Sequence, residues 1–497
     1  MAFDPAVPAV WHLTNSSIWD GQLFLNGWNM SENGTADVTD KSTGEVLAKI
    51  ANANSADVNA ASRSAVVAAK LWSRTPPEQR AAILRRAGQL LLQYEEEAVY
   101  WIVRESGSSR LKAGLELRTS REMLDHAAGL AELPSTKLIR DDSDMWSRLE
   151  RIPLGVVGVI APFNFPLALA MRAVAPALAS GNAVVLKPSL NTAVSGGILI
   201  ARALEEAGLP VGVLQVLPGG NEAGEALVQD PNVSMISFTG STAAGRRIAS
   251  VAGQSLKRVQ LELGGKNPFI VLSDADLEQA AMAGAFASFL HQGQICVAVG
   301  VHLVHETLME RYAVRVAELA KAIKVGDPYR EQVGLGPIFS ERQLNHVHTL
   351  VEEAIQSGAE LVEGGTFQNH YYRPTVLKNV PLSTRAFREE IFGPVAVIVK
   401  FRDDGEAIQL ANDSGYALTA AVFGALQHAR EVGEKIETGM LHINDTTFVS
   451  DINAPFGGMK ASGNFSRIGG NGSLEEFTTS RWTTETRKPT AIEIPTT

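Results

Sequence analysis

The chain of 497 residues contains a single cysteine, Cys296, and no long apolar run. One cysteine cannot form an internal disulfide, which is typical of proteins in a reducing compartment. No stretch reaches the about 18 uninterrupted apolar residues expected of a membrane-spanning helix. Residues 1–15 lack the basic start and the apolar centre of a secretory signal. We therefore expect a cytoplasmic protein with no membrane partner.

An excess of positive charge is also absent. Lys and Arg number 44 against 54 Asp and Glu, which gives a formal net charge of −10. A chain of that sign does not suit nucleic acid or an anionic membrane, so a small or neutral substrate is the expected partner. Apolar residues make up 45% of the chain and charged residues 20%, which are ordinary values for a globular protein. The length predicts roughly two to four structural units.

Several motifs that would fix a function are missing. No G-x-G-x-x-G follows a strand, which argues against an ordinary Rossmann dehydrogenase. The spacing of Gly240 and Gly245 resembles the start of a P-loop, but Arg246 and Arg247 stand where Lys and Ser or Thr are required. There is no G-x-S-x-G elbow, and His305-Glu306 has no second histidine at zincin spacing. The ten histidines form no ligand-spaced cluster, so we expect no metal.

Short apolar runs do alternate with helical segments from Gly155 onward, which is the pattern of βαβ units and a parallel sheet. Thr192 is the expected N-cap of one of these helices, with Gly208 just past its end. A second α/β pattern covers 274–453, and the polar stretch 134–150 predicts a hairpin arm. The expected strands are Val156–Ile160, Ala183–Leu186, Val213–Leu217 and Met235–Phe238, and the helices between them are 167–179, 193–207 and 223–228.

Three residues are candidates for chemistry. Cys296 lies between a helix-like segment, 274–290, and a strand-like run, 300–304, so its thiol is expected at a connection, where nucleophiles are usually presented. Glu262 lies in an apolar run, where a raised pKa suits a general base. Asn164 follows the first strand of the sheet, where ligands of open α/β sheets bind. Taken singly, each has an ordinary alternative: a small buried hydrophobic residue, an edge-strand surface residue and a turn residue.

Two further features are weaker. The segment 237–245 runs from a strand into a helix N-terminus, whose free N–H groups suit a phosphate. His291, five residues before Cys296, would permit a Cys–His dyad, but a core or solvated histidine is the more usual state.

Together these segments resemble the aldehyde dehydrogenase superfamily over nearly the whole chain, because six motifs occur in the order that the family shows. Three segments, 160–164, 289–293 and 442–445, are most similar to bacterial aromatic aldehyde dehydrogenases of the benzaldehyde and vanillin type. The six motifs are Pro162–Pro166, Phe238–Gly245, Leu261–Gly265, Gln292–Cys296, Glu389–Pro394 and Pro455–Gly463.

The resemblance implies the oxidation of an aromatic aldehyde to its acid. Cys296 would attack the aldehyde, Asn164 and the Cys296 N–H would form an oxyanion hole, and Glu262 would activate water. The implied cofactor is NAD. Leu190 stands where the family commonly has an acidic residue that disfavours a 2′-phosphate, so NADP stays open. Phe163 replaces the usual Trp before Asn164. The implied cofactor-binding residues are Lys187, Ser189, Gly220, Gly240, Ser241, Glu390 and Phe392.

The implied architecture is α/β, with a parallel-sheet dinucleotide-binding domain (1–130 and 151–261), a second α/β catalytic domain (262–470) and a small β arm (131–150 and 471–497) that joins copies into a homodimer or homotetramer. Oxidation of an aliphatic aldehyde or semialdehyde is the alternative within this class, and a panel of aldehydes separates the two. A cofactor-independent thiol esterase would use the same Cys296 and Glu262 but would turn over esters without nucleotide. A binding protein would leave Cys296 unreactive toward alkylating agents.

Overall fold

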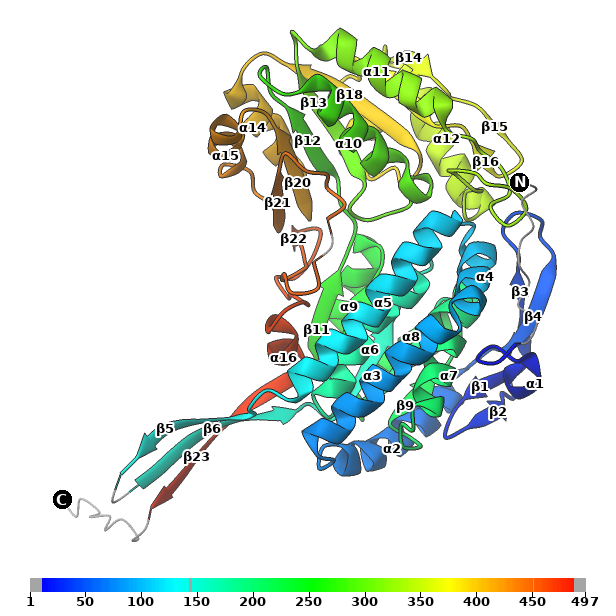
Figure 1. Ribbon diagram of the computed structural model, residues 1–497, viewed down its shortest axis with the longest axis vertical. Coiled ribbons are helices and arrows are strands. Elements are labelled where there is room, and N and C mark those ends of the chain that lie inside the picture. Colours follow the sequence, from blue (N-terminus) through cyan, green and yellow to red (C-terminus); the bar gives the residue numbers. More distant parts are fainter. Residues whose placement is uncertain (1–10, 143–144, 450, 487–497) are drawn as a thin grey trace.

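The computed structural model describes residues 11–142, 145–449 and 451–486. It contains two seven-stranded sheets, each covered by helices on both faces, and a three-stranded arm that projects away from both (Figure 1). The predicted α/β class is confirmed, and each predicted strand of the first sheet forms, to within two residues at its ends.

The first sheet has the order β11-β10-β7-β8-β9-β1-β2. Strands β7 to β11 pair in parallel, whereas β1 and β2 add an antiparallel edge. From β7 the chain proceeds through β8 and β9 in one direction and then returns to place β10 and β11 on the other side. The switch point therefore lies between β7 and β10, where open α/β sheets bind ligands beyond the carboxyl ends of the strands. The strands are β1 Gln22–Phe24, β2 Trp28–Met30, β7 Val156–Ile160, β8 Ala183–Lys187, β9 Leu214–Val216, β10 Met235–Thr239 and β11 Arg258–Glu262.

Helices cover both faces of this sheet because successive strand residues point to opposite sides. Val156 and Val185 pack with α2, α8 and α9, while Val157 and Val184 pack with α3 to α7. The apolar stripe of α3 around Ala87 belongs to the core on this second face. The helices are α2 Ser55–Trp72, α3 Pro77–Gln93, α4 Glu95–Ser106, α5 Arg110–Ala131, α6 Pro166–Ala179, α7 Leu199–Glu206, α8 Asn221–Gln229 and α9 Thr242–Gly253.

The prediction that Thr192 caps a continuous helix is wrong. The segment is a 3₁₀ turn (η1, Leu190–Thr192) followed by a π-helical turn (η2, Val194–Ile198) and then α7. Glu105 of α4 accepts hydrogen bonds from the backbone N–H groups of Val194 (3.0 Å) and Ser195 (2.6 Å). The Thr192 hydroxyl is buried with no hydrogen-bond partner in the described chain. The carboxylate of Glu105, from another helix, therefore caps this segment in place of Thr192.

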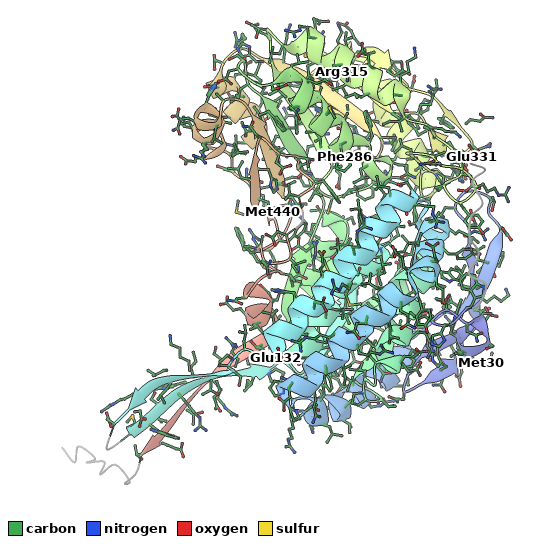
Figure 2. All side chains as sticks on the ribbon, viewed as in Figure 1. Met30, Glu132, Phe286, Arg315, Glu331 and Met440 are labelled. Carbon is green, nitrogen blue, oxygen red and sulfur yellow. The ribbon has the colours of Figure 1, made fainter. Side chains whose placement is uncertain are left out.

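The second sheet has the order β14-β17-β18-β13-β12-β20-β21 and is parallel except for β14. Helices α10 and α11 pack on one face, and α12 to α15 pack on the other. Figure 2 shows Arg315 of α11 on the outer side of this body, where it pairs with Glu278 at 2.6 Å. The elements are β12 Asn267–Val271, α10 Leu277–Phe289, η3 Leu290–Gly293, β13 Val299–His305, α11 Met309–Ala322, α12 Glu341–Gln356, β14 Glu360–Glu363, β17 Thr375–Lys378, α13 Arg385–Arg388, β18 Val395–Phe401, α14 Asp404–Asn412, β20 Thr419–Phe423, α15 Leu426–Gly433 and β21 Met440–Ile443.

The arm is a sheet of order β23-β6-β5, formed by β5 Thr136–Asp141, β6 Met145–Pro153 and β23 Thr478–Thr486. The hairpin predicted over 134–150 therefore forms, and a strand from the C-terminal region joins it. Residues 487–497, predicted to belong to the arm, lie outside the described residues. Glu132, at the end of α5, lies near the base of the arm (Figure 2). The remaining short elements are α1 Ser16–Trp19, β3 Thr35–Thr39, β4 Val46–Ala51, β15 Phe367–Gln368, β16 Tyr371–Tyr372, β19 Tyr416–Ala417, β22 Met459–Lys460 and α16 Gly472–Phe477.

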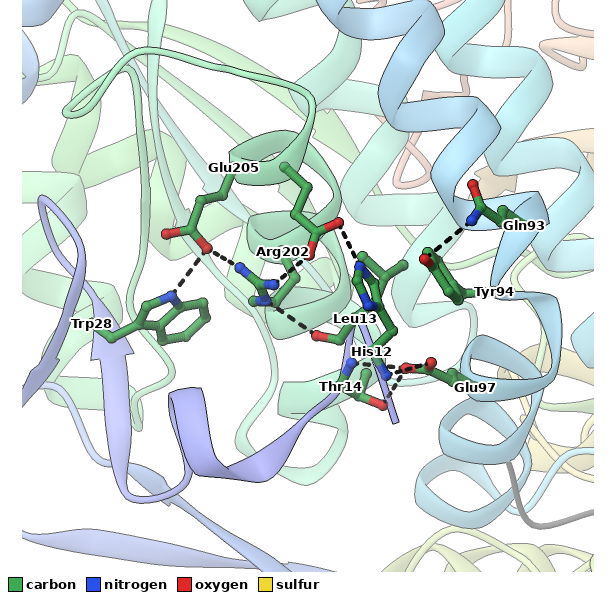
Figure 3. A network of polar contacts seen from close by, with 10 residues as sticks. His12, Leu13, Thr14, Trp28, Gln93, Tyr94, Glu97, Arg202 and Glu205 are labelled. Carbon is green, nitrogen blue, oxygen red and sulfur yellow. Dashed lines mark hydrogen bonds and ion pairs between the residues drawn. The ribbon is translucent and has the colours of Figure 1, made fainter. Parts of the chain in front are cut away.

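The segment that precedes α1 is fastened to the helices of the first sheet (Figure 3). Glu97 of α4 accepts hydrogen bonds from the backbone N–H groups of His12 (2.7 Å) and Thr14 (2.8 Å). Arg202 of α7 donates to the carbonyl of Leu13 (3.3 Å). These contacts satisfy the buried backbone groups of an irregular segment, so it packs on the domain without secondary structure of its own.

Within 11–142, 145–449 and 451–486, no helix has the length and apolar character needed to cross a membrane. In the same residues, no group of three or more His, Cys, Asp or Glu is arranged to hold a metal ion.

Candidate active site

Asn164 and Ser241 lie at the switch point of the first sheet. Asn164 is in the loop between β7 and α6, and Ser241 caps α9 directly after β10. Because β7 and β10 are neighbouring parallel strands, both loops open at the same edge. The predicted strand-to-helix turn at 237–245 is therefore present. The Ser241 hydroxyl accepts a hydrogen bond from the N–H of Ala244 at 3.4 Å.

The loop that carries the cysteine begins with a strained turn. After α10 ends, His291 (φ 50°), Gln292 (φ 57°) and Gly293 (φ 64°) are all left-handed. Non-glycine residues in this region cost about 1–3 kcal/mol each and persist only where their surroundings hold them. The Gln292 side chain donates to the carbonyls of Gly107 (2.8 Å) and Pro337 (3.0 Å), and a Cβ on Gly293 would lie 2.2 Å from the Gly393 carbonyl oxygen. The turn is thus tied to both sheet bodies.

Cys296 follows in a tight turn closed by the hydrogen bond from Ala298 N to Ile295 O at 3.0 Å. The side-chain amide of Asn267, on β12, donates to the carbonyls of Cys296 (2.8 Å) and Ala298 (2.7 Å). The thiol is therefore presented from a connection, as predicted, and the backbone around it is held from a neighbouring strand.

Asn164 reaches the same loop from the first sheet. Its side chain is 4% exposed, and Nδ2 donates to the carbonyl of Gln294 at 2.9 Å. An amide NH₂ group has two donors, so one N–H fixes the side chain and the other remains for a ligand.

Glu262 is the last residue of β11, which is an edge strand, yet it is only 4% exposed. The segment 456–463 covers it: Gly463 bridges Glu262, and Leu263 N donates to Ser462 O at 3.0 Å. Gln260 donates to Oε1 at 3.1 Å, while Oε2 is buried with no partner in the described chain. Burial raises the pKa of Glu262 to about 8, against the attraction of Arg172. The predicted raised pKa is thus present, and the surface-residue alternative is wrong.

The electrostatics at Cys296 favour the neutral thiol. Burial, with a smaller contribution from the carboxylates of Glu390 and Glu262, raises the pKa of Cys296 to about 12. Arg172 opposes them, as does the backbone N–H of Val297. Because this pKa lies far above neutrality, the thiol must lose its proton to a base when it reacts.

Two cavities of similar size meet at the thiol, and Asn164, Leu169 and Cys296 line both. The aromatic cavity, of about 280 Å³, lies between α5, α6 and the loops around Cys296 and Phe448, and its other lining residues include Phe165, Phe456, Arg172 and Thr119, with Arg118 and Glu122 exposed at its rim. The catalytic cavity, of about 290 Å³, lies on the side of β10 and its other lining residues include Phe163, Gly240, Ser241, Glu262, Arg342, His346, Glu390 and Phe392.

A third cavity, of about 300 Å³, lies between α8 and α9. It is lined by apolar residues such as Ile160, Phe238 and Val251 and by Lys187. The Lys187 ammonium donates to the carbonyl of Gly219 at 2.7 Å, and burial lowers its pKa to about 8. The α8–α9 cavity and the catalytic cavity flank the same turn between β10 and α9.

The structure brings most predicted cofactor residues to these cavities. Gly240, Ser241, Glu390 and Phe392 line the catalytic cavity, and Lys187 lines the α8–α9 cavity. Glu390 accepts a hydrogen bond from Gly265 N at 3.2 Å, and burial raises its pKa to about 7. Ser189 and Gly220 line none of the three cavities: the Ser189 hydroxyl caps η1, accepting from Asn191 N at 3.3 Å, and Gly220 precedes α8.

His291 does not form the dyad considered from the sequence. Its ring is buried against Phe165, 5.7 Å between ring centroids, and neither ring nitrogen has a hydrogen-bond partner in the described chain. Burial and the charge of Lys112 hold the pKa of His291 well below its ordinary value. It lines neither cavity that contains Cys296, which is the position of a core histidine.

Sequence reasoning missed Arg172. Its guanidinium lies 3.9 Å above the centroid of the Phe456 ring, and the residue lines the aromatic cavity with Cys296. Arg172 is the only charged residue in the otherwise apolar helix Pro166–Ala179, and this isolated charge was the sequence signal for it.

Comparison with known proteins agrees with this geometry. A family model described as "Aldehyde dehydrogenase family" matches residues 28–483. The benzaldehyde dehydrogenase [NAD(+)] of Pseudomonas putida is 48% identical, covering 95% of this chain and 97% of that protein. A vanillin dehydrogenase of Amycolatopsis sp. is 46% identical, covering 94% and 96%. The structure of Staphylococcus aureus betaine aldehyde dehydrogenase in complex with NAD+ superposes with a TM-score of 0.92, at 30% identity, over 96% of this chain and 97% of that one. The chain therefore belongs to the aldehyde dehydrogenase family.

Proposed function

We propose that the protein oxidises an aromatic aldehyde to the carboxylic acid with NAD, through a cysteine thiohemiacetal and a thioester. The observation that carries this proposal is the convergence of Cys296, Asn164 and Glu262 at the junction of an aromatic cavity and a second cavity continuous with a helix N-terminus.

The first step is the attack of the Cys296 thiolate on the aldehyde carbon, which forms a C–S bond and leaves the negative charge on the former carbonyl oxygen. The free N–H of the Asn164 amide and the backbone N–H of Cys296 are the donors for this oxyanion. The backbone N–H of Cys296 is suitable because the turn closed by Ala298 and Ile295 does not use it. One such donor contributes about 10²–10³-fold to the rate in enzymes where it has been removed.

The residues of the catalytic and α8–α9 cavities fit a dinucleotide. A Cβ on Gly240 would lie 2.5 Å from the Phe238 ring, and one on Gly264 would lie 2.2 Å from the Glu390 carboxylate, so the chain keeps both walls free of side chains. Lys187 and Glu390 would hold the two riboses, and the N-terminus of α9 would face the pyrophosphate. A bound NAD would supply the hydride acceptor for the carbon attached to Cys296.

Glu262 acts in the last step. The residue lines the catalytic cavity with Cys296, and its Oε2 has no hydrogen-bond partner among the described residues. This carboxylate takes a proton from the water that attacks the thioester. The C–S bond then breaks, the acid leaves, and the thiol recovers its proton. The same carboxylate is the base that we assign to remove the thiol proton at the start.

The shape of the aromatic cavity supports an aryl substrate over an aliphatic one. Phe165 and Phe448 lie 6.0 Å apart between ring centroids, and Phe456 lies on the same cavity wall. Rings at such distances offer edge and face contacts to another ring. Benzaldehyde and vanillin are the aldehydes in the names of the relatives, and they are the first substrates to test.

NAD is the preferred cofactor of the proposal although Leu190 is not acidic. Leu190 packs in the apolar cluster with Trp19, whereas Glu225 of α8 lines the α8–α9 cavity with Lys187. A carboxylate at this wall repels a 2′-phosphate. Because Glu225 also pairs with Arg247 (2.6 Å) near the surface, its influence is modest, and Glu225→Gln should improve the use of NADP by about two- to fivefold.

The test is the steady-state oxidation of benzaldehyde, vanillin and hexanal with NAD and with NADP, followed at 340 nm. The wild type should favour the aromatic aldehydes and NAD by kcat/KM, and Cys296→Ala should abolish the reaction. Retained activity in Cys296→Ala would overturn the mechanism, whereas a preference for hexanal would overturn only the aromatic assignment. Ester hydrolysis without nucleotide and without aldehyde oxidation would favour the thiol esterase.

We also propose that the arm joins copies into a homodimer or homotetramer, that residues 1–130 and 151–261 bind the dinucleotide while 262–470 carry the catalytic cysteine, and that the enzyme works in the reducing cytoplasm. Leu138 (51%), Ile139 (58%) and Trp482 (69%) are exposed on the arm, which supports the first point. The free thiol of Cys296 supports the last, because a catalytic thiol is lost on oxidation.

A further inference from the structure

Arg172 is a cation inside the aromatic cavity with an unused donor. It projects from α6, and its Nη1 atom is shielded from solvent with no hydrogen-bond partner among the residues that the structure describes. The guanidinium lies on the face of Phe456. A buried donor without a partner is costly, so its position calls for a negative charge or an acceptor nearby.

The other charged groups of the aromatic cavity do not provide a buried positive charge. On the side of the aromatic cavity, Glu116 is bound to Lys112 at 2.5 Å, and Arg118 and Glu122 are exposed at the rim. On the side of the catalytic cavity, the two buried carboxylates add negative charge next to the thiol. The titratable groups that line the two cavities with Cys296 are Glu116, Arg118, Glu122, Arg172, Glu262, Arg342, His346 and Glu390.

We propose that Arg172 is a positioning residue for the nucleophile, supplying the fixed positive charge that stabilises the Cys296 thiolate and, with it, the Glu262 carboxylate. This inference rests on the proposed function, in which Cys296 is the nucleophile and Glu262 the base. It adds a residue to the reaction without assigning it a contact with the substrate.

The electrostatics agree with this placement. Burial is the main cause that raises the pKa of Cys296 and of Glu262, and Arg172 is the strongest of the charges that lower it in both cases. In turn, Glu262 and Cys296 are the two groups that raise the pKa of Arg172 against its own burial. One cation is therefore shared by the nucleophile and the base, and a loss of its charge affects both.

The test is the alkylation of the full-length protein by iodoacetamide, without aldehyde or nucleotide. Because the chain has one cysteine, every cysteine adduct lies on Cys296, and its rate of formation can be followed by peptide mass. Arg172→Met should lower the second-order rate between about pH 7 and 9. The loss should be about threefold for each unit by which the pKa of the thiol rises, since the tenfold loss of thiolate is partly offset by its greater nucleophilicity. Arg172→Lys, which keeps the charge, should stay within about twofold of the wild type.

Arg80→Met is the matched control. It also removes a half-buried guanidinium next to α6, since Arg80 donates to the carbonyl of Ala179 at 3.1 Å, but it lies outside the three cavities. Its alkylation rate should equal that of the wild type, and thermal melts establish that each variant is folded.

Two results would overturn the proposal: a folded Arg172→Met that alkylates at the wild-type rate, or an equal loss in Arg172→Lys and Arg172→Met, which would point to packing on Phe456. Neither result bears on the proposed function, which is tested separately by the aldehyde panel and by the activity of Cys296→Ala.

Discussion

The side-chain amide of Asn164 donates a hydrogen bond to the backbone carbonyl of Gln294 at 2.9 Å, two residues before Cys296. This bond joins the switch point of the first sheet to the loop that follows α10 of the second body. It also orients the second N–H of the amide, so the proposed oxyanion donor and the proposed nucleophile are positioned relative to each other before an aldehyde arrives. Such preorganisation is the usual source of oxyanion stabilisation.

Removal of this donor should reduce turnover without removing the nucleophile. Asn164→Ala should lower kcat by about 10²–10³-fold, with a smaller effect on KM, because the interaction strengthens in the transition state. Asn164→Asp should be at least as impaired, because a carboxylate accepts hydrogen bonds and repels an oxyanion. Steady-state kinetics with benzaldehyde measure both, and a kcat within threefold of the wild type in either variant would remove Asn164 from the oxyanion hole.

The pKa of Glu262 sets the expected pH dependence of activity. A general base must be deprotonated, and burial places this pKa at about 8. Deacylation should therefore speed up as the pH rises through about 8 and fall by about tenfold for each unit below it. In Glu262→Gln, the rise of the rate with pH should disappear, and kcat should fall by about 10²–10⁴-fold. A wild-type profile that is flat between about pH 6 and 9 would contradict the assignment of Glu262 as the base.

The raised pKa of Glu262 also predicts that stability falls over the pH range in which activity rises. The folded pKa lies above the ordinary 4.5, so the stability that the protonated group contributes is complete below about 4.5 and is lost as the pH rises toward 8. Glu262→Gln should therefore unfold at a higher temperature than the wild type at pH 8, and the gap should close near pH 5. Thermal melts of both proteins across this range isolate Glu262, because all other groups titrate in both.

The sequence predicted the candidate reactive residues better than it predicted the side chains that hold them in place. Asn164 and Cys296 lie at connections next to predicted elements, Glu262 lies in an apolar run, and the catalytic cavity contains all three. The burial of Glu262 was predictable only from its apolar neighbours, because the segment that covers it lies about 200 residues further along the chain.

The wrong prediction for Thr192 and the failure to predict Arg172 have the same cause. Glu105, on another helix, replaced Thr192 as a cap, and Arg172 belongs to a helix whose pattern indicates core. Local patterns do not contain partners that are distant in sequence. They therefore predict where an element lies more reliably than which side chain completes it.

Glu116 is a further support that no local pattern indicates. One carboxylate oxygen accepts from the N–H groups of Leu167 (2.8 Å) and Ala168 (3.2 Å), the first turn of α6, and the other binds Lys112. It thereby holds the helix that begins two residues after Asn164. Because both partners are buried, Glu116→Ala should leave the Lys112 charge buried without a counter-charge and destabilise the protein by about 3–5 kcal/mol.

A pair of double variants separates this support from the ion pair. Lys112→Met with Glu116→Gln removes both charges but keeps an acceptor for the start of α6, so kcat should stay close to that of the wild type. Lys112→Met with Glu116→Leu removes the acceptor as well, and kcat should fall while the unfolding temperature stays near that of the first pair. Equal kcat values in the two double variants would show that the position of Asn164 does not depend on Glu116.

The arm should determine the oligomeric state. Strand β5 is an edge of the three-stranded sheet, all six of its residues are exposed, and its unpaired N–H and C=O groups are a template for a second copy. Ile139, 58% exposed on β5, is a suitable position for a charge. The wild type at micromolar concentration should have a multiple of the 53.2 kDa mass of one chain by light scattering, whereas Ile139→Lys should shift it toward one chain.

Val67→Lys, at a similarly exposed apolar residue on α2 (62%), is the control that should leave the mass unchanged. A wild-type protein of single-chain mass would contradict the proposed assembly, and an unchanged mass in Ile139→Lys would move the interface away from β5.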